Sequence, residues 1–111
     1  MKVAVTGANG HVGVNLCDAL IRQGHQVRAL THQHNEFLSG IPVEQIRGDV
    51  MDPESLRTFM EGIDTVFHLA ARISITGDRD GSVGKINAEG TRNMVEAARA
   101  SGVRRFIHVS S

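Results

Sequence analysis

The chain has 111 residues, a formal net charge of zero and an isoelectric point near 7.0. This length allows one domain with a single hydrophobic core but not two. Because there is no basic excess, the charge balance excludes electrostatic binding to nucleic acid or to an anionic membrane surface. The sequence also lacks an apolar stretch long enough to span a bilayer and a signal-peptide core at its N-terminus.

Cys17 is the single cysteine, so no internal disulfide can form. A chain without disulfides suits a reducing compartment, and we therefore expect a cytoplasmic protein. Since Cys17 falls within a predicted helix, we interpret it as a small packed apolar residue rather than a nucleophile.

The strongest local pattern is a strand, a glycine-rich turn and a helix at the start of the chain. Val3, Ala4 and Val5 form a short apolar run typical of a strand buried on both faces, and Thr6 ends it. The turn that follows has glycine at every third position, at Gly7, Gly10 and Gly13. An amphipathic helix is then predicted from its apolar positions, which are Val12, Leu16, Ala19 and Leu20.

This arrangement directs backbone N–H groups and the positive end of a helix at one point, where a phosphate or pyrophosphate binds well. The three glycines are suited to a tight turn, to close approach of a ligand and to close packing of the helix on the strand. The alternative is that they form only a turn. The spacing is G-x-x-G-x-x-G, and the absence of Gly-Lys-Ser or Gly-Lys-Thr disfavours a P-loop.

Further along, strands alternate with helices. Gly24 is expected to end the first helix, and Asp52 and Pro53 are strong signals for the start of another. Strands are predicted over 26–31, 43–47, 65–69 and 105–109, with helices over 53–61 and 85–101. The strand over 43–47 is the least apolar and is expected at a sheet edge.

Alternating strands and helices indicate right-handed βαβ units and a doubly wound parallel sheet of the Rossmann type. We predict the strand order 3-2-1-4-5, with a cofactor crevice between the first and fourth strands, where the winding reverses. The first two crossovers place their helices on one face and the next two on the other. The first face should therefore leave an exposed apolar patch over the fourth and fifth strands, filled by a partner chain or by later sequence.

Five motifs together resemble the extended short-chain dehydrogenases/reductases, in the branch of sugar-nucleotide epimerases and dihydroflavonol-reductase-like proteins. They are T-G-A-N-G-H-V-G at 6–13, G-D-V at 48–50, H-L-A-A at 68–71, N-A-E-G-T-R-N at 87–93 and G-V-R-R-F-I-H-V-S-S at 102–111. The resemblance spans the chain and implies an NAD(P)-binding segment, residues 1–111, that is cut before the catalytic half.

The resemblance implies a role for each matching position. The pyrophosphate would lie on Gly7, Gly10, His11, Val12 and Gly13. Asp49 would accept from the adenine amino group beside the backbone of Val50; the alternative is a carboxylate that caps its own loop. The ribose would lie over Leu69, Ala70 and Ala71.

Two further positions complete the implied site. Asn87 would reach the cofactor from its helix, unless it is only a polar residue near a helix start. Ser111 aligns with the serine that hydrogen-bonds the substrate oxygen. Gly90 lies inside a helix at a cost of about 0.5–1 kcal/mol, which we attribute to a close approach to the sheet.

The family's catalytic base is absent. It is a tyrosine in a Tyr-x-x-x-Lys motif, which passes a proton while hydride moves to or from the nicotinamide, and this chain has no tyrosine. We therefore expect dinucleotide binding without turnover, as part of a larger NAD(P)-dependent oxidoreductase or epimerase with a small-molecule substrate. The alternative is a non-catalytic dinucleotide sensor that works by partner binding or self-association.

The choice of cofactor depends on the end of the second strand, where an NAD site usually has an acid. Thr31 and His32 hold those positions, with Arg28 before and His34 after them. With no acid to repel a 2′-phosphate, the sequence favours NADP over NAD, although the family's arginine is also missing.

Three further features of the sequence give weaker evidence of function. His32 and His34 have no Cys, Asp or Glu at metal-site spacing, so we expect no metal site. His68 and His108 fall inside strands and are interpreted as core histidines with satisfied hydrogen bonds. Asp78-Arg79-Asp80 is interpreted as a solvated loop.

Overall fold

The computed structural model describes residues 1–7, 11–31, 38, 40–69 and 82–109; the side chains of His11 and of residues 82–87 are outside this description. Five parallel strands form one sheet in the order β3-β2-β1-β4-β5. The strands are β1 (Lys2–Thr6), β2 (Gln26–Thr31), β3 (Glu44–Arg47), β4 (Thr65–Leu69) and β5 (Arg105–Val109), and the helices are α1 (His11–Arg22), α3 (Pro53–Met60) and α4 (Ser82–Ala100). The predicted doubly wound fold and strand order are confirmed.

The strand sequences explain their places in the sheet. β1 is buried from Val3 to Thr6 because it pairs with β2 on one side and β4 on the other. β3 has no fully buried residue and lies at one edge, as its polar sequence predicts. Apolar side chains on both faces of a strand suit its centre, and a polar strand tolerates the exposed edge.

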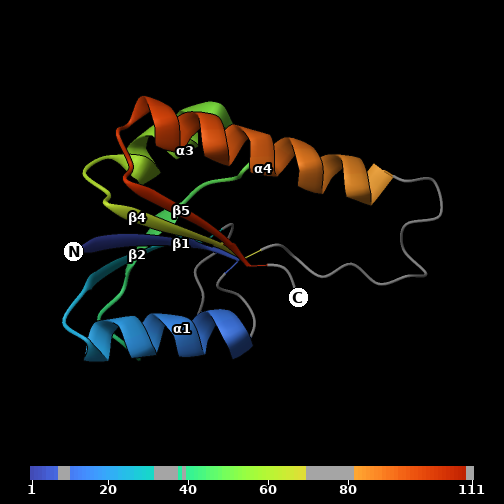
Figure 1. Ribbon diagram of the computed structural model, residues 1–111. Helices are drawn as coiled ribbons and strands as arrows, with labels where there is room; N and C mark the ends of the chain where they lie inside the picture. Colours follow the sequence, from blue (N-terminus) through green and yellow to red (C-terminus); the bar gives the residue numbers. More distant parts are fainter. Residues whose placement is uncertain (8–10, 32–37, 39, 70–81, 110–111) are drawn as a thin grey trace.

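The helices cover the two faces unequally (Figure 1). The sheet is seen nearly edge-on, with α1 below it and both α3 and α4 above it. The core under α1 includes Val3, Val5, Cys17 and the fully buried Leu38. The core under α3 and α4 includes Leu56, Phe59, Met60, Val66 and Met94, all fully buried.

The start of α3 follows its predicted signals. Asp52 is the N-cap and its carboxylate accepts a hydrogen bond from the backbone N–H of Glu54 at 3.2 Å. Pro53 occupies the first helical position, where its missing N–H costs nothing. The predicted α4 began at 85, but the helix begins at Ser82. One glycine at 84 costs about 1 kcal/mol, which the rest of a long helix offsets.

The buried stripe of α1 differs from the prediction. Cys17 and Leu20 are buried together with Gly13, whereas Val12 is 65% exposed and Ala19 is also exposed. Small residues at Gly13 and Cys17 let the helix lie close to the sheet. The apolar series through Val12 and Ala19 is therefore a second stripe, mostly left uncovered.

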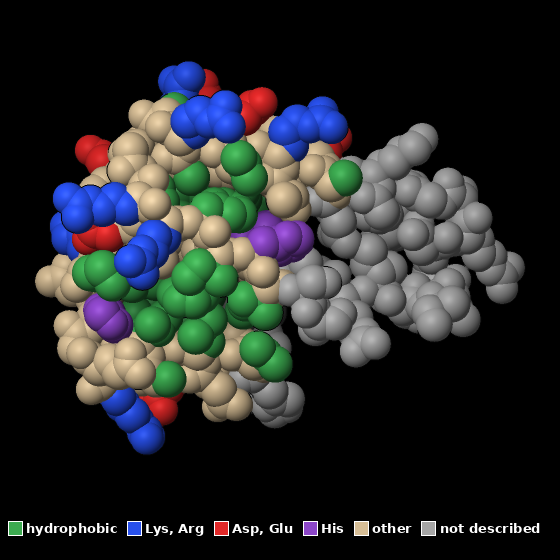
Figure 2. All heavy atoms as spheres, viewed as in Figure 1, with side chains coloured by type: hydrophobic (Ala, Val, Ile, Leu, Met, Phe, Trp, Pro, Cys, Tyr) green, Lys and Arg blue, Asp and Glu red, His purple; other side chains and the backbone are tan. Residues whose placement is uncertain are grey.

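The predicted apolar patch is present on the α1 face, over β4 and β5. Phe67 and Val109 are only half-buried there, and Ile107 is 38% exposed. Figure 2 shows hydrophobic side chains gathered in one continuous group on this side of the molecule. No helix of the described part of the chain covers these positions, because α1 lies against β1 and β2.

Candidate dinucleotide-binding edge

The predicted site lies at the carboxyl ends of the strands, and its centre is the turn after β1. Gly7 has a φ of 71°, which favours glycine. A Cβ atom at this position would clash with the carbonyl oxygen of Leu69, at the end of β4. The chain therefore turns sharply between the ends of β1 and β4, at the predicted crevice. Gly10 lies outside the described residues, and Gly13 is buried where α1 packs on the sheet.

A hydrogen-bonded histidine joins these two strands to α4. The Nδ1 atom of His68 lies 2.6 Å from the hydroxyl of Thr6, and its Nε2 atom lies 3.0 Å from the hydroxyl of Thr91. The ring is 6% exposed. Burial, with a smaller contribution from His108, lowers the pKa of His68 to about 4, so the imidazole is neutral near pH 7. The interpretation of His68 as a satisfied core histidine is confirmed.

The same interpretation is wrong for His108. This side chain is exposed, although its ring stacks on His68 with the ring centroids 5.4 Å apart. The reason is that β5 lies at the edge of the sheet, where it has one neighbouring strand among the described residues. Alternation within a strand cannot tell an edge from the centre of a sheet.

Asp49 caps its own loop in this structure. Its Oδ1 atom accepts a hydrogen bond from the N–H of Met51 at 2.9 Å, and the hydroxyl of Ser55 donates to its carbonyl oxygen at 3.0 Å. This is the structural alternative that the sequence left open. The side chain is nonetheless exposed at the carboxyl edge of the sheet, so the implied contact with adenine stays a prediction.

Helix α4 is fastened to the loop after β3. The amide of Asn93 donates to the carbonyl oxygen of Val50 at 2.9 Å. A Cβ atom at Gly90 would lie 2.7 Å from a methyl group of Val50. The close approach predicted for Gly90 is therefore real, but its partner is this loop and not the sheet. The loop folds back over α4, which no local pattern reveals.

The remaining predicted site residues differ in burial, and several lie outside the described part of the chain. Thr31 ends β2 with only 3% of its surface exposed, and its carbonyl oxygen accepts from the N–H of Gly48 at 3.0 Å. Leu69 is buried at the end of β4, and Val12 is exposed in the first turn of α1. The sites implied at His32, Ala70, Ala71 and Ser111, and the side chains of His11 and Asn87, lie outside the described residues.

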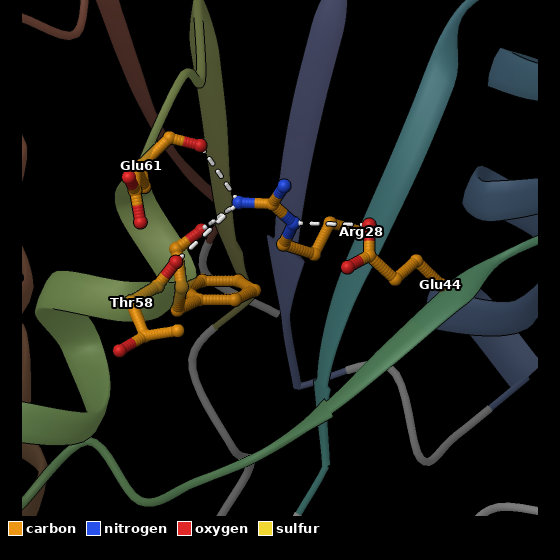
Figure 3. Close-up of polar contacts among 5 residues, drawn as sticks. Arg28, Glu44, Thr58 and Glu61 are labelled. Carbon is orange, nitrogen blue, oxygen red and sulfur yellow. Dashed lines mark hydrogen bonds and ion pairs between the residues drawn. The ribbon is translucent and has the colours of Figure 1, made fainter.

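Arg28 is engaged far from the site (Figure 3). Its guanidinium donates to the carbonyl oxygens of Phe59 and Glu61 at 2.9 and 2.8 Å, where α3 ends, and pairs with Glu44 at 3.3 Å. These contacts satisfy carbonyls that a helix end leaves unpaired. Arg28 therefore supports α3 and not the end of β2, where a 2′-phosphate would lie.

Two chemical possibilities are tested by the described residues. Cys17 is fully buried, and burial raises the pKa of its thiol to about 11, so it is a packed apolar residue as predicted. Among the described residues no group of three or more His, Cys, Asp or Glu is placed to hold a metal ion. His32 and His34 lie outside that part of the chain.

Sequence reasoning missed the residues that position the edge. Thr6, Thr91 and Asn93 each make a hydrogen bond that links one strand end or loop to another element. A signal was present, because each stands in a motif that the resemblance quoted, and His68 is a polar residue inside an apolar strand. Their roles needed the tertiary structure, since their partners are between 23 and 62 residues away.

No helix among the described residues is long and apolar enough to cross a membrane. This agrees with the sequence, in which the predicted helices are amphipathic. The fold thus offers one edge with a glycine turn, a helix N-terminus and an exposed acid, on a sheet whose other features are structural.

Known proteins are similar to this chain in sequence, and a solved structure is similar to it in fold. A sterol demethylase protein B from Methylococcus capsulatus is 42% identical over all of this chain, and a 2-alkyl-3-oxoalkanoate reductase from Stenotrophomonas maltophilia is 40% identical. The crystal structure of a short-chain dehydrogenase/reductase superfamily protein from Agrobacterium tumefaciens, with bound NAD, is 38% identical with a TM-score of 0.82.

These relatives are longer. The chain covers 34% and 33% of the two curated proteins and 33% of the crystallised one, while all of this chain is matched in each case. The family model for NAD dependent epimerases/dehydratases matches residues 3–111. The glycine turn, the strand order and these matches agree, and the chain belongs to the NAD dependent epimerase/dehydratase family.

Proposed function

We propose that this chain binds NAD(P) at the carboxyl edge of its sheet, in the crevice between β1 and β4. The observation that carries the proposal is the Gly7 turn, which leaves β1 with a φ of 71° and lies against the end of β4. The turn leads into α1, whose first residue is His11. A helix N-terminus that follows a glycine turn is suited to a pyrophosphate.

The other groups have roles that follow from their positions. The backbone of the turn and the first residues of α1 would hold the pyrophosphate, with the exposed Val12 beside it. Asp49 would accept from the adenine amino group, since it is exposed after β3. Leu69, at the end of β4, would lie beside the ribose. When bound, the nicotinamide supplies a hydride acceptor or donor.

The cofactor preference is a finer proposal. No acid stands at Thr31 or His32 to repel a 2′-phosphate, so we expect NADPH to bind more tightly than NADH. The support is in the sequence alone, because Thr31 is buried and Arg28 is engaged at α3. A related structure contains NAD, and this makes the comparison of the two cofactors informative.

The longer protein to which such a segment corresponds would be an oxidoreductase or epimerase acting on a small molecule. A 2-alkyl-3-oxoalkanoate reductase and a sterol demethylase protein B are among the relatives that match this segment. The chain contains no tyrosine, and therefore has no Tyr-x-x-x-Lys base. We expect it to bind the dinucleotide without catalysing turnover. The open apolar face would be covered by a second copy or by further sequence.

The first test is a titration of the chain with NADPH and with NADH, in which binding is detected by the fluorescence of the reduced nicotinamide. The chain has no Trp and no Tyr, so its own emission is weak and does not obscure the signal. Saturable binding of either cofactor supports the proposal. Tighter binding of NADH would overturn only the preference for NADP, and no binding by a folded chain would overturn the proposal.

A matched pair of glycine variants tests the place of binding. Gly7 and Gly24 both have positive φ, but a Cβ atom at Gly24 has nothing within 4 Å. Both alanine variants should lose about 1 kcal/mol of stability or more from backbone strain. Only Gly7→Ala should also weaken dinucleotide binding, by about tenfold or more. Equal affinities in two folded variants would place the ligand elsewhere.

A further inference from the structure

His68 is a polar ring in a site where an apolar side chain would cost less to bury. It is 6% exposed, and Phe106 lies beside it with the ring centroids 6.0 Å apart. Burying an imidazole is unfavourable unless both nitrogens have partners. Both do, in Thr6 and Thr91, on a strand and a helix that lie 85 residues apart in the sequence. The ring therefore supplies two directed bonds that packing alone would not.

These two hydrogen bonds lie next to the Gly7 turn of the proposed binding site. Thr6 immediately precedes Gly7, and Leu69, whose carbonyl oxygen Gly7 contacts, immediately follows His68. The register also pairs Thr6 with His68 across β1 and β4. One histidine thus lies beside the last residue of β1 and next to the residue against which the turn packs. A displacement of this ring would move both sides of the crevice.

The bond to Thr91 adds a third element. Thr91 lies in the same helix as Asn93, which donates a hydrogen bond to Val50 in the loop after β3, and Gly90, which packs closely against Val50. The loop carries Asp49, the acid proposed to meet the adenine. Through His68, the glycine turn and the adenine loop are therefore joined to one helix.

We propose that His68 is a positioning residue for the dinucleotide, which holds the Thr6–Gly7 turn through Nδ1, while its bond to helix α4 through Nε2 contributes little to affinity. The inference rests on the proposed function, which it deepens by naming what sets the shape of the site. A neutral imidazole has one donor and one acceptor nitrogen, so the two threonines are bonded in opposite senses. The ring does not touch the ligand, and it acts through the turn.

Two amide variants separate the two bonds. In His68→Asn, the amide reaches about as far as Nδ1 and can keep the bond to Thr6, whereas in His68→Gln it reaches about as far as Nε2 and can keep the bond to Thr91. We expect His68→Asn to bind NADPH and NADH within about threefold of the unsubstituted chain. We expect His68→Gln to bind about tenfold more weakly, which corresponds to the loss of one hydrogen bond, the bond to Thr6.

Stability is measured for both variants, because each loses one hydrogen bond. A purely structural role predicts that affinity follows stability and does not distinguish the two amides. Thr6→Val and Thr91→Val form a second pair, in which only the first should reproduce the His68→Gln effect. These valine substitutions keep the side-chain shape, and they remain informative if an amide variant fails to fold.

A ligand-free measurement separates this role from the proposed function. Both His68 variants remove the ring current of the imidazole and are therefore compared with each other. The amide resonance of Gly7, assigned by nuclear magnetic resonance, should move further in His68→Gln than in His68→Asn, and further in Thr6→Val than in Thr91→Val. Equal affinities and equal Gly7 resonances within each pair would overturn the role of His68 while leaving dinucleotide binding intact. Absence of binding by the unsubstituted chain would overturn both the proposed function and this role.

Discussion

The two faces of the sheet are built differently. The face under α3 and α4 buries Leu56, Phe59, Met60 and Met94 completely. The face under α1 is closed over β1 and β2 but leaves Phe67, Ile107 and Val109 partly exposed over β4 and β5. The same five strands thus have one finished face and one half-finished face.

The comparison shows where stability and surface come from. Helices between strands 3 and 4 and between strands 4 and 5 must lie on one face, because parallel crossovers are right-handed. The opposite face over β4 and β5 then depends on something that is not among the described residues. Residues that support the proposed binding edge lie on the finished face, because His68 of β4 contacts α4, and Gly90 and Asn93 belong to α4.

The largest expected effect compares a phenylalanine on each face. Phe59→Ala, on the finished face, should lower the free energy of unfolding by about 3–5 kcal/mol, because the side chain is fully buried. Phe67→Ala, on the open face, should cost about 1–2 kcal/mol, since part of that side chain is already in water. Urea denaturation followed by circular dichroism measures both. Similar losses would show that the open face is covered in solution.

The second effect concerns acid. The folded-state pKa of His68 is about 4, below the usual 6.5, because burial and then His108 disfavour its charged form. The unfolded chain binds this proton first as the pH falls below 6.5. Stability present above that pH is therefore lost as the pH approaches 4, by at most about 3 kcal/mol.

The measurement is the free energy of unfolding at several pH values between 7 and 4. In His68→Asn the dependence on pH should be flatter, because the variant has no imidazole at this position. An equally steep pH dependence in the variant would show that other titratable groups cause the loss of stability in acid.

The smallest effect on stability is expected at the open face. Ile107→Ser should change the free energy of unfolding by less than about 1 kcal/mol, since Ile107 is 38% exposed. It should nevertheless weaken self-association, if a second copy covers this patch. Sedimentation at several protein concentrations tests this, with Val12→Ser, another exposed apolar position, as the control. A monomer at every concentration for the unsubstituted chain would contradict self-association.

Much of this molecule follows from local sequence. The apolar run in β1, Gly7, and the Asp52–Pro53 start of α3 are short-range signals, and each lies where the sequence predicts it. The strand order follows as well, because alternating strands and helices with a glycine turn after the first strand leave few right-handed arrangements. Helix α4 is longer than predicted, since its first turn contains a glycine that local propensity disfavours.

Tertiary structure decided what surrounds each side chain. His68 and His108 occupy similar places in neighbouring strands, yet one is buried with two partners and the other is exposed, because β4 has a strand on each side and β5 has one neighbour among the described residues. Gly90 meets Val50 rather than the sheet, and α1 buries Gly13 and Cys17 rather than Val12 and Ala19. Periodicity and motifs fix the elements and their order. Contacts between residues far apart in the chain fix the shape of the site, because they exist only once the sheet and its helices have packed.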